Sequence, residues 1–200
     1  MKRKGPKKPI DPLKLTCTKT DCQNDLHAFR PDKKTIKHHA EGECVGCHQK
    51  LVDFEQTRRR DLGEVDETFE QMKREYVRHW FWSNRLNAVA HRRALTKGPA
   101  ATEAEMRKRL RTAIGGAKPF RDGFQTPIDD PKNIVYWAQH ATASCCRRCV
   151  EYWHGIPRGQ ELTESEIDYL LRLAMKFIEQ KMAQSSGDSS SSSSSDEGSH

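Results

Sequence analysis

The chain has 200 residues, of which 34% are hydrophobic and 32% charged, and its net charge is +7 at neutral pH. This length allows one ordinary domain or two small ones, and the low hydrophobic content predicts a small core that bound metal helps to stabilise. No stretch approaches the ~20 apolar residues of a membrane span, and the N-terminus lacks the apolar region of a signal peptide. We therefore expect a cytoplasmic protein with no membrane partner. In that reducing compartment its seven cysteines are better explained as metal ligands than as disulfides.

The two ends of the chain are expected to be disordered. Residues 1–14 hold six lysines or arginines, one acid and three prolines, which predicts a flexible basic arm. Residues 184–200 are dominated by serine, a composition typical of a disordered tail. Between these ends we predict a mainly α-helical protein with a small cysteine-rich module at its N-terminal side.

Four cysteines lie in residues 15–60: Cys17 and Cys22 are spaced C-x4-C, and Cys44 and Cys47 are spaced C-x2-C. Two short turns that each carry a cysteine pair are typical of a zinc ribbon, in which both pairs share one tetrahedral Zn²⁺. Four thiolates fill that shell, so the spacing predicts a zinc-ribbon-like β module with a closed, structural site. Three nearby histidines are expected at the surface and are the alternatives if one cysteine is not a ligand: His38, His39 and His48.

Residues 62–183 have the apolar periodicity of a helical domain. One helix is predicted from about Gly63 to Leu95, where apolar side chains recur at spacings of three and four residues. A second is predicted from Thr102, which fits a capping box with Glu105, to the glycine pair at 115–116.

Two further helical segments follow. The third runs from about Asn133 to His154 and is expected to stop at Gly155. The last begins at Thr163, which fits a second capping box with Glu166.

The third segment carries a second cysteine group, C-C-x2-C, formed by Cys145, Cys146 and Cys149. On a helix these three thiols share one face. A break just before them would place the thiols at a helix N-terminus, where the macrodipole favours thiolate, and would bring His140 within reach.

Three interpretations of this group stay open. It is a second zinc site, structural or catalytic, with His140 or His154 as a further ligand. Alternatively it is a reactive-thiol site whose cysteine is activated by His140, or its cysteines are part of the core. The sequence therefore predicts one Zn²⁺ site and leaves a second one open.

The region around this group resembles a bacterial family of unknown function with the signature Q-T-P…A-Q-H-A-T-x-x-C-C-R-x-C…W-H-G-I-P. The matching segments are Gln125–Pro127, Ala138–Cys149 and Trp153–Pro157, and the resemblance extends over about residues 76–180. It implies no activity and no catalytic residue. It does imply that seven residues are neighbours in space: Gln125, His140, Cys145, Cys146, Cys149, Trp153 and His154.

Three functions are compatible with these patterns. The first is a zinc-binding, nucleic-acid-associated protein, in which exposed arginines contact phosphates and tryptophans stack on bases. The second is a metal-dependent hydrolase or nuclease that uses His140, Cys145 and Cys149. The third is a zinc-stapled module that binds a protein partner and has no activity. The arginines predicted to contact nucleic acid are Arg58, Arg59, Arg60, Arg147 and Arg148.

Overall fold

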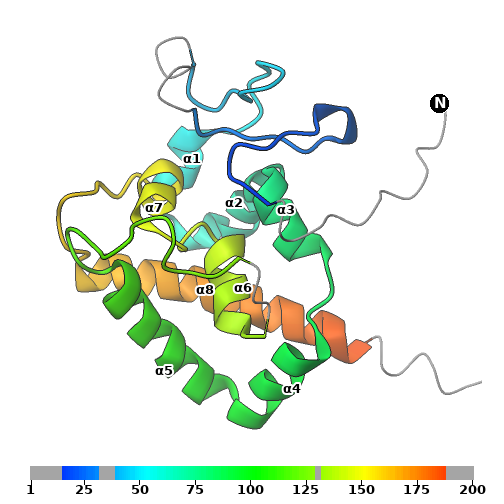
Figure 1. The fold of residues 1–200 in the computed structure, drawn as a ribbon, viewed down its shortest axis with the longest axis vertical. Coiled ribbons are helices and arrows are strands. Elements are labelled where there is room, and N and C mark those ends of the chain that lie inside the picture. Colours follow the sequence, from blue (N-terminus) through cyan, green and yellow to red (C-terminus); the bar gives the residue numbers. More distant parts are fainter. Residues whose placement is uncertain (1–14, 32–38, 129–131, 188–200) are drawn as a thin grey trace, which may run out of the picture.

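The structure, a computed structural model, describes residues 15–31, 39–128 and 132–187. The predicted basic arm, His38 and the serine-rich stretch from residue 188 onward lie outside the described residues. The described part is mainly α-helical, as predicted. Figure 1 shows a loop-rich N-terminal segment (residues 15–60) at one end of the molecule and the helices below it.

The N-terminal segment contains little regular structure. Its described residues form a single 3-10 turn, Cys22–Asn24, and one short helix, α1 (Phe54–Arg58), whose first turn is capped by the Asp53 carboxylate. Two tight turns are each closed by one antiparallel bridge, Asp21 with Leu26 and Glu43 with Lys50. These bridges are isolated and do not extend into a ladder, so no strand forms in the described residues, and the predicted zinc-ribbon β module is not found there.

The predicted helix over residues 63–95 is divided into shorter pieces. The amide of Tyr76 donates to the carbonyl of His27 at 2.7 Å instead of to a carbonyl four residues earlier, and this interrupts the helix. A later helix starts afresh at Asn87, whose side chain accepts from the amide of Ala90 at 2.8 Å. The pieces are a 3-10 turn at Leu62–Glu64, α2 (Val65–Met72), α3 (Tyr76–Ser83) and α4 (Ala88–Lys97).

The next helix, α5 (Pro99–Arg109), begins three residues before the predicted capping box. Pro99 occupies its first turn, where a missing amide costs nothing. The hydroxyl of Thr102 therefore donates back to the Gly98 carbonyl at 2.8 Å instead of capping. A π-helical turn, Leu110–Ile114, continues α5 up to the predicted glycine pair.

The third predicted segment contains a break. It consists of α6 (Ile134–Ala141) and α7 (Arg147–His154), separated by a turn in which Ala143 takes the left-handed conformation with φ of 54°. Gly155, with φ of 63°, ends α7 as expected.

The last helix, α8 (Glu164–Gly187), has the predicted capping box. The Thr163 amide donates to the Glu166 carboxylate at 2.9 Å, and the Glu166 amide donates to the Thr163 hydroxyl at 3.3 Å. The helix continues through residues 184–187, which were expected to be disordered.

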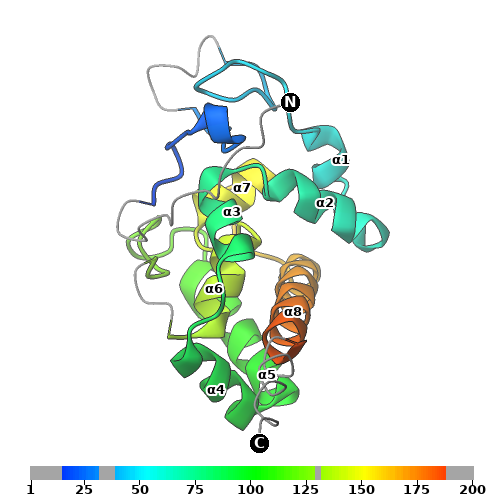
Figure 2. The ribbon, with the colours of Figure 1, turned by 90° about the vertical axis from the view of Figure 1, so that its right-hand side faces the viewer.

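The helices pack around α6. Helix α6 lies between α3 and α8, while α5 contacts α8 and α1 contacts α7 (Figure 2). Trp80, Trp82 and Trp137 are buried in this core, so they are not available to stack on bases. Within the described residues, no helix combines the length and apolar character needed to cross a membrane.

Candidate metal centres

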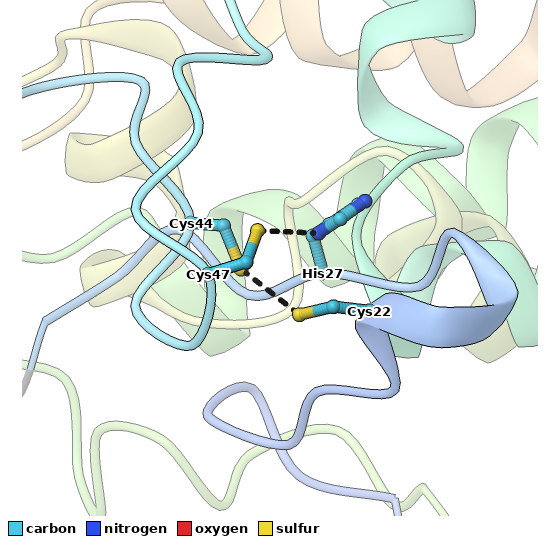
Figure 3. Close-up of side chains that lie close together, drawn as sticks. All are labelled: Cys22, His27, Cys44 and Cys47. Atoms are coloured by element: carbon cyan, nitrogen blue, oxygen red, sulfur yellow. Dashed lines mark hydrogen bonds between the residues drawn. The ribbon is translucent and has the colours of Figure 1, made fainter.

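The first group of candidate ligands lies in the N-terminal segment. It consists of Cys22, His27, Cys44 and Cys47, whose ligand atoms all lie within 4.8 Å of one another. Figure 3 shows the four side chains directed at a common point, Cys22 and His27 from one turn and the other two from the second. Three thiols and one imidazole at this separation match the donor set of a tetrahedral zinc site. We call this set the first group.

His27 is held with one ring nitrogen toward the thiols. Its Nδ1 lies 3.7 Å from the Cys47 sulfur, and its Nε2 lies 3.1 Å from Oδ1 of Asp25. Because a carboxylate only accepts, Nε2 carries the proton and the lone pair of Nδ1 faces the sulfur atoms. A carboxylate behind a metal-binding histidine fixes its tautomer and its orientation in just this way.

The backbone around Cys44 stabilises its thiolate. Burial raises the pKa of Cys44, but amide groups of Ala28, Cys47 and Gly46 outweigh it and lower the pKa to about 6. The Gly46 amide lies 3.4 Å from the Cys44 sulfur. A side chain at Gly46 would approach the Cys22 sulfur to 3.3 Å, so glycine leaves room for the thiols to meet. Deprotonated sulfur is the form that binds metal.

Cys17 is placed apart from the group in which it was predicted. It lines the same cavity as Cys149 of the helical part, and His27 takes the fourth place beside Cys22. The reason is local: the 3-10 turn after Cys22 and the Asp21–Leu26 bridge return the chain to the same point within five residues.

The second group is formed by Cys145, Cys146 and Cys149, and their sulfur atoms also lie within 4.8 Å of one another. All three are buried. Cys146 is the N-cap of α7, so the thiols lie at the N-terminus of that helix, where its dipole favours negative charge. The left-handed turn at Ala143 produces this arrangement, as the hypothesis of a broken helix predicted.

A buried arginine accompanies the second group. Arg78 has no exposed surface, and its Nη2 lies 3.1 Å from the Cys149 sulfur. Its Nη1 lies 3.8 Å from the Cys145 sulfur, and its Nε lies 3.0 Å from the Glu75 carboxylate. Arg30, from the N-terminal segment, approaches the same Cys149 sulfur at 4.0 Å.

These contacts favour a thiolate at Cys149. Hydrogen bonds from the other two thiols of the group and from Cys17 hold the pKa of Cys149 well below its ordinary value, and the charge of Arg78 adds to this. The roles of Arg78 and Glu75 were not predicted from the sequence. The available signal was a charged residue inside the aromatic run Y-V-R-H-W-F-W of α3.

His140 lies beside the second group but is held by the backbone. Its Nε2 lies 3.2 Å from the carbonyl of Thr126 and 3.1 Å from that of Pro127, so this nitrogen carries a proton. Its ring stacks on Phe81 with centroids 4.8 Å apart. Burial, assisted by Arg78, lowers the pKa of His140 to about 4, which keeps the ring neutral.

Both ring nitrogens of His154 also lie within hydrogen-bond distance of groups other than the cysteines. Its Nε2 lies 2.9 Å from the Thr142 carbonyl, and its Nδ1 lies 3.1 Å from the Tyr169 hydroxyl. Burial lowers its pKa to about 4. Neither predicted histidine ligand is among the atoms that converge in the second group.

The segments named by the resemblance lie together. The Thr126 hydroxyl donates to the Gln139 side chain at 3.2 Å and to the Cys145 carbonyl at 3.0 Å. The Gln125 side chain donates to Asp122 at 3.2 Å. The contacts of Thr126 join the first segment to the second, and the 2.9 Å contact of His154 with the Thr142 carbonyl joins the third segment to the second.

The arginines predicted to contact nucleic acid are mostly engaged within the protein. Arg147 is buried and donates to the carbonyl of Gln160 at 3.2 Å. Arg148 donates to the carbonyl of Asp122 at 3.0 Å through Nη2, although its charge has no carboxylate partner among the described residues. The other three are in ion pairs: Arg58 with Glu41, Arg59 with Glu64 and Arg60 with Glu166.

A family model described as a domain of unknown function (DUF4186) matches residues 66–179, which include the second group and Arg78. The first group, Cys17 and Arg30 lie outside the matched residues. No solved structure matches the chain.

Proposed function

The chain belongs to the family described as a domain of unknown function (DUF4186), and we propose that this member is a zinc-binding protein with two separate centres. The observation that carries the proposal is the convergence of two sets of ligand atoms, each within 4.8 Å. Neither set contains a carboxylate, and thiolate with imidazole is the donor set that Zn²⁺ prefers.

The first centre is the first group: Cys22, His27, Cys44 and Cys47. Four protein ligands complete the tetrahedral shell, so this zinc is structural and binds no substrate. Its role is to hold together a segment with almost no regular secondary structure of its own. The hydrogen bond between Asp25 and His27 supports this role, because it presets the imidazole for metal.

The second centre is formed by the three thiols of the second group, with Cys17 as the fourth ligand. The position of Cys17 on the same cavity as the three thiols supports this assignment. Four thiolates around Zn²⁺ leave a charge of −2, which is costly in a buried site unless cations lie nearby. Arg78 and Arg30 provide two such cations beside Cys149.

A second candidate for this centre is a reactive thiolate at Cys149. The specific observation in its favour is the 3.1 Å approach of Arg78, which stabilises thiolate with or without metal. In this alternative Arg78 activates the sulfur. His140, the activator expected from the sequence, has its Nε2 against two carbonyl groups.

The experiment that separates these functions measures metal content by mass spectrometry on purified protein, with Cys47→Ser and Cys149→Ser as a matched pair. The proposal expects two zinc ions per chain, and each variant loses one of them. Iodoacetamide labelling of the wild type completes the test. One zinc, lost only in Cys47→Ser, together with rapid labelling of Cys149 supports the reactive thiolate. No zinc in the wild type contradicts both centres.

Nucleic-acid association gains no support from these residues. The three arginines of residues 58–60 are paired with carboxylates, and the tryptophans of the core are buried. We therefore limit the proposed function to metal binding.

A further inference from the structure

A cavity of about 560 Å³ adjoins the second group, and the four cysteines Cys17, Cys145, Cys146 and Cys149 line one side of it. Its volume is in the range of small-molecule sites. We propose that this cavity binds a small organic oxyanion, a phosphate or carboxylate carried on a flat apolar group. This inference rests on the proposed function in one respect: the cysteines proposed to bind the second zinc also line this cavity.

The charge of the cavity indicates an anion. Three arginines line it, Arg30, Arg121 and Arg148, and no aspartate or glutamate does so within the part of the chain that the structure describes. Arg30 is directed at the Cys149 sulfur and serves the thiols. Arg121 and Arg148 have no carboxylate partner among the described residues. Arginine binds oxyanions through two parallel hydrogen bonds, which makes it well suited to this task.

Arg121 lies in the loop between the π-helical turn and α6, and the acid next to it in the chain, Asp122, is engaged elsewhere. The Asp122 carboxylate accepts from the Arg147 amide at 2.9 Å and from the Gln125 side chain at 3.2 Å. It therefore caps the start of α7 and does not pair with Arg121 beside it. Among the described residues, Arg121 therefore has no carboxylate that balances its charge.

The position of Arg148 depends on a glycine in the same loop. Gly123 has φ of 101°, and a side chain there would lie 1.9 Å from Nη2 of Arg148. The guanidinium thus lies against the bare backbone of the loop and donates to the Asp122 carbonyl at 3.0 Å. A neutral carbonyl leaves its charge free to attract an anion.

An aromatic side chain indicates the apolar part of the ligand. Phe124 lines the cavity and is 73% exposed, an unusual state for a large apolar residue. In the proposed complex, the flat apolar group of the ligand packs on Phe124, while Arg121 and Arg148 bind its oxyanion. These three residues define the ligand class.

Calorimetric titration of the zinc-loaded full chain with phenyl phosphate tests this inference. Arg121→Gln and Arg148→Gln should each weaken binding about tenfold or more, because each removes a charge-assisted contact. Arg172→Gln is the matched control, since Arg172 is exposed on α8 and does not line the cavity. Phe124→Ala should weaken phenyl phosphate but not inorganic phosphate. Thermal unfolding of each variant confirms that it is folded.

Two results would overturn the inference: no binding of phenyl phosphate by the wild type, or an equal effect of Arg172→Gln and the cavity variants. Zinc content measured on the same samples keeps the two proposals apart. Binding that depends on Arg121 and Arg148 in protein with one zinc would keep the anion site and reject the second metal centre. Two zinc ions per chain without phenyl phosphate binding would keep the second metal centre and reject the anion site.

Discussion

His27 and Glu75 pair through a parallel β-bridge that joins the N-terminal segment to the helices. The His27 amide donates to the Arg74 carbonyl at 2.9 Å, and the Tyr76 amide donates to the His27 carbonyl at 2.7 Å. The side chain of His27 belongs to the first group. The side chain of Glu75 contacts Arg78, which lies beside the second group. The two candidate centres are therefore linked through one pair of residues.

Removal of the carboxylate behind His27 should weaken zinc binding at the first centre. We expect Asp25→Asn to lower the affinity there by about 10- to 100-fold, because the neutral amide can still accept from Nε2 but no longer raises the basicity of the imidazole. Competition with a chromophoric chelator measures this affinity. Asp21→Asn is the matched control, since Asp21 accepts from Asn24 and has no contact with the imidazole. Equal affinities of Asp25→Asn and the wild type would show that the Asp25 carboxylate does not raise the basicity of the ligand.

The placement of Cys17 leads to a distinct prediction. Cys17→Ser should keep the zinc of the first centre and weaken only the second, whereas Cys22→Ser should lose the first zinc. Zinc counts on the two variants give a direct comparison. Loss of the first zinc in Cys17→Ser would restore the four-cysteine site that the spacing predicts and reject the ligand role of His27.

Replacement of Arg78 should strongly destabilise the protein. We expect Arg78→Met to lower the free energy of unfolding by about 3–5 kcal/mol, because it leaves the buried Glu75 carboxylate without its partner. Urea denaturation measures the change. Arg92→Met, at an exposed position of α4, should change stability by less than about 0.5 kcal/mol. If Arg78→Met were equally mild, the buried ion pair would not contribute to the fold.

Lys181 should make stability depend on alkaline pH. It is 3% exposed, donates to the Trp82 carbonyl at 2.6 Å, and burial lowers its pKa to about 8 from 10.5. Between these two pKa values the unfolded chain binds more protons than the folded one, so the free energy of unfolding rises with pH. Below about pH 8 both forms are charged and this contribution is constant. The slope is at most about 1.4 kcal/mol per pH unit.

Urea denaturation of wild type and Lys181→Met from pH 7 to 10 measures this contribution as a difference. The variant should lack the rise above pH 8. Lys176→Met, on the same helix but partly exposed, should keep it. If the difference in free energy of unfolding between the wild type and Lys181→Met did not vary with pH, the burial of an ionisable amine would be contradicted.

Local signals predicted much of the fold. The capping box at Thr163 and Glu166 involves residues three apart, so it could be read directly and is found as expected. The break before the second cysteine group is predicted if Thr142 or Ser144 caps a helix that starts at the cysteines. The break is found, but Cys146 and not Thr142 or Ser144 is the N-cap of α7.

Long-range contacts account for what was not predicted. The long helix is interrupted because the Tyr76 amide bonds to His27, a residue 49 positions away. The fourth ligand position beside Cys22 likewise depends on how the turns fold back. Spacing alone favoured Cys17 for this position, whereas His27 lies there. Arg78 could not be assigned to the thiols, because its partner Cys149 lies 71 residues further on.

The most direct test of the account is zinc-edge X-ray absorption on Cys149→Ser, in which only the first centre is expected to hold metal. The predicted shell has three sulfur atoms at about 2.3 Å and one nitrogen at about 2.0 Å. That result would establish Cys22, His27, Cys44 and Cys47 as the ligands. A shell of four sulfur atoms would contradict the role of His27, and a shell of only oxygen or nitrogen would contradict the centre itself.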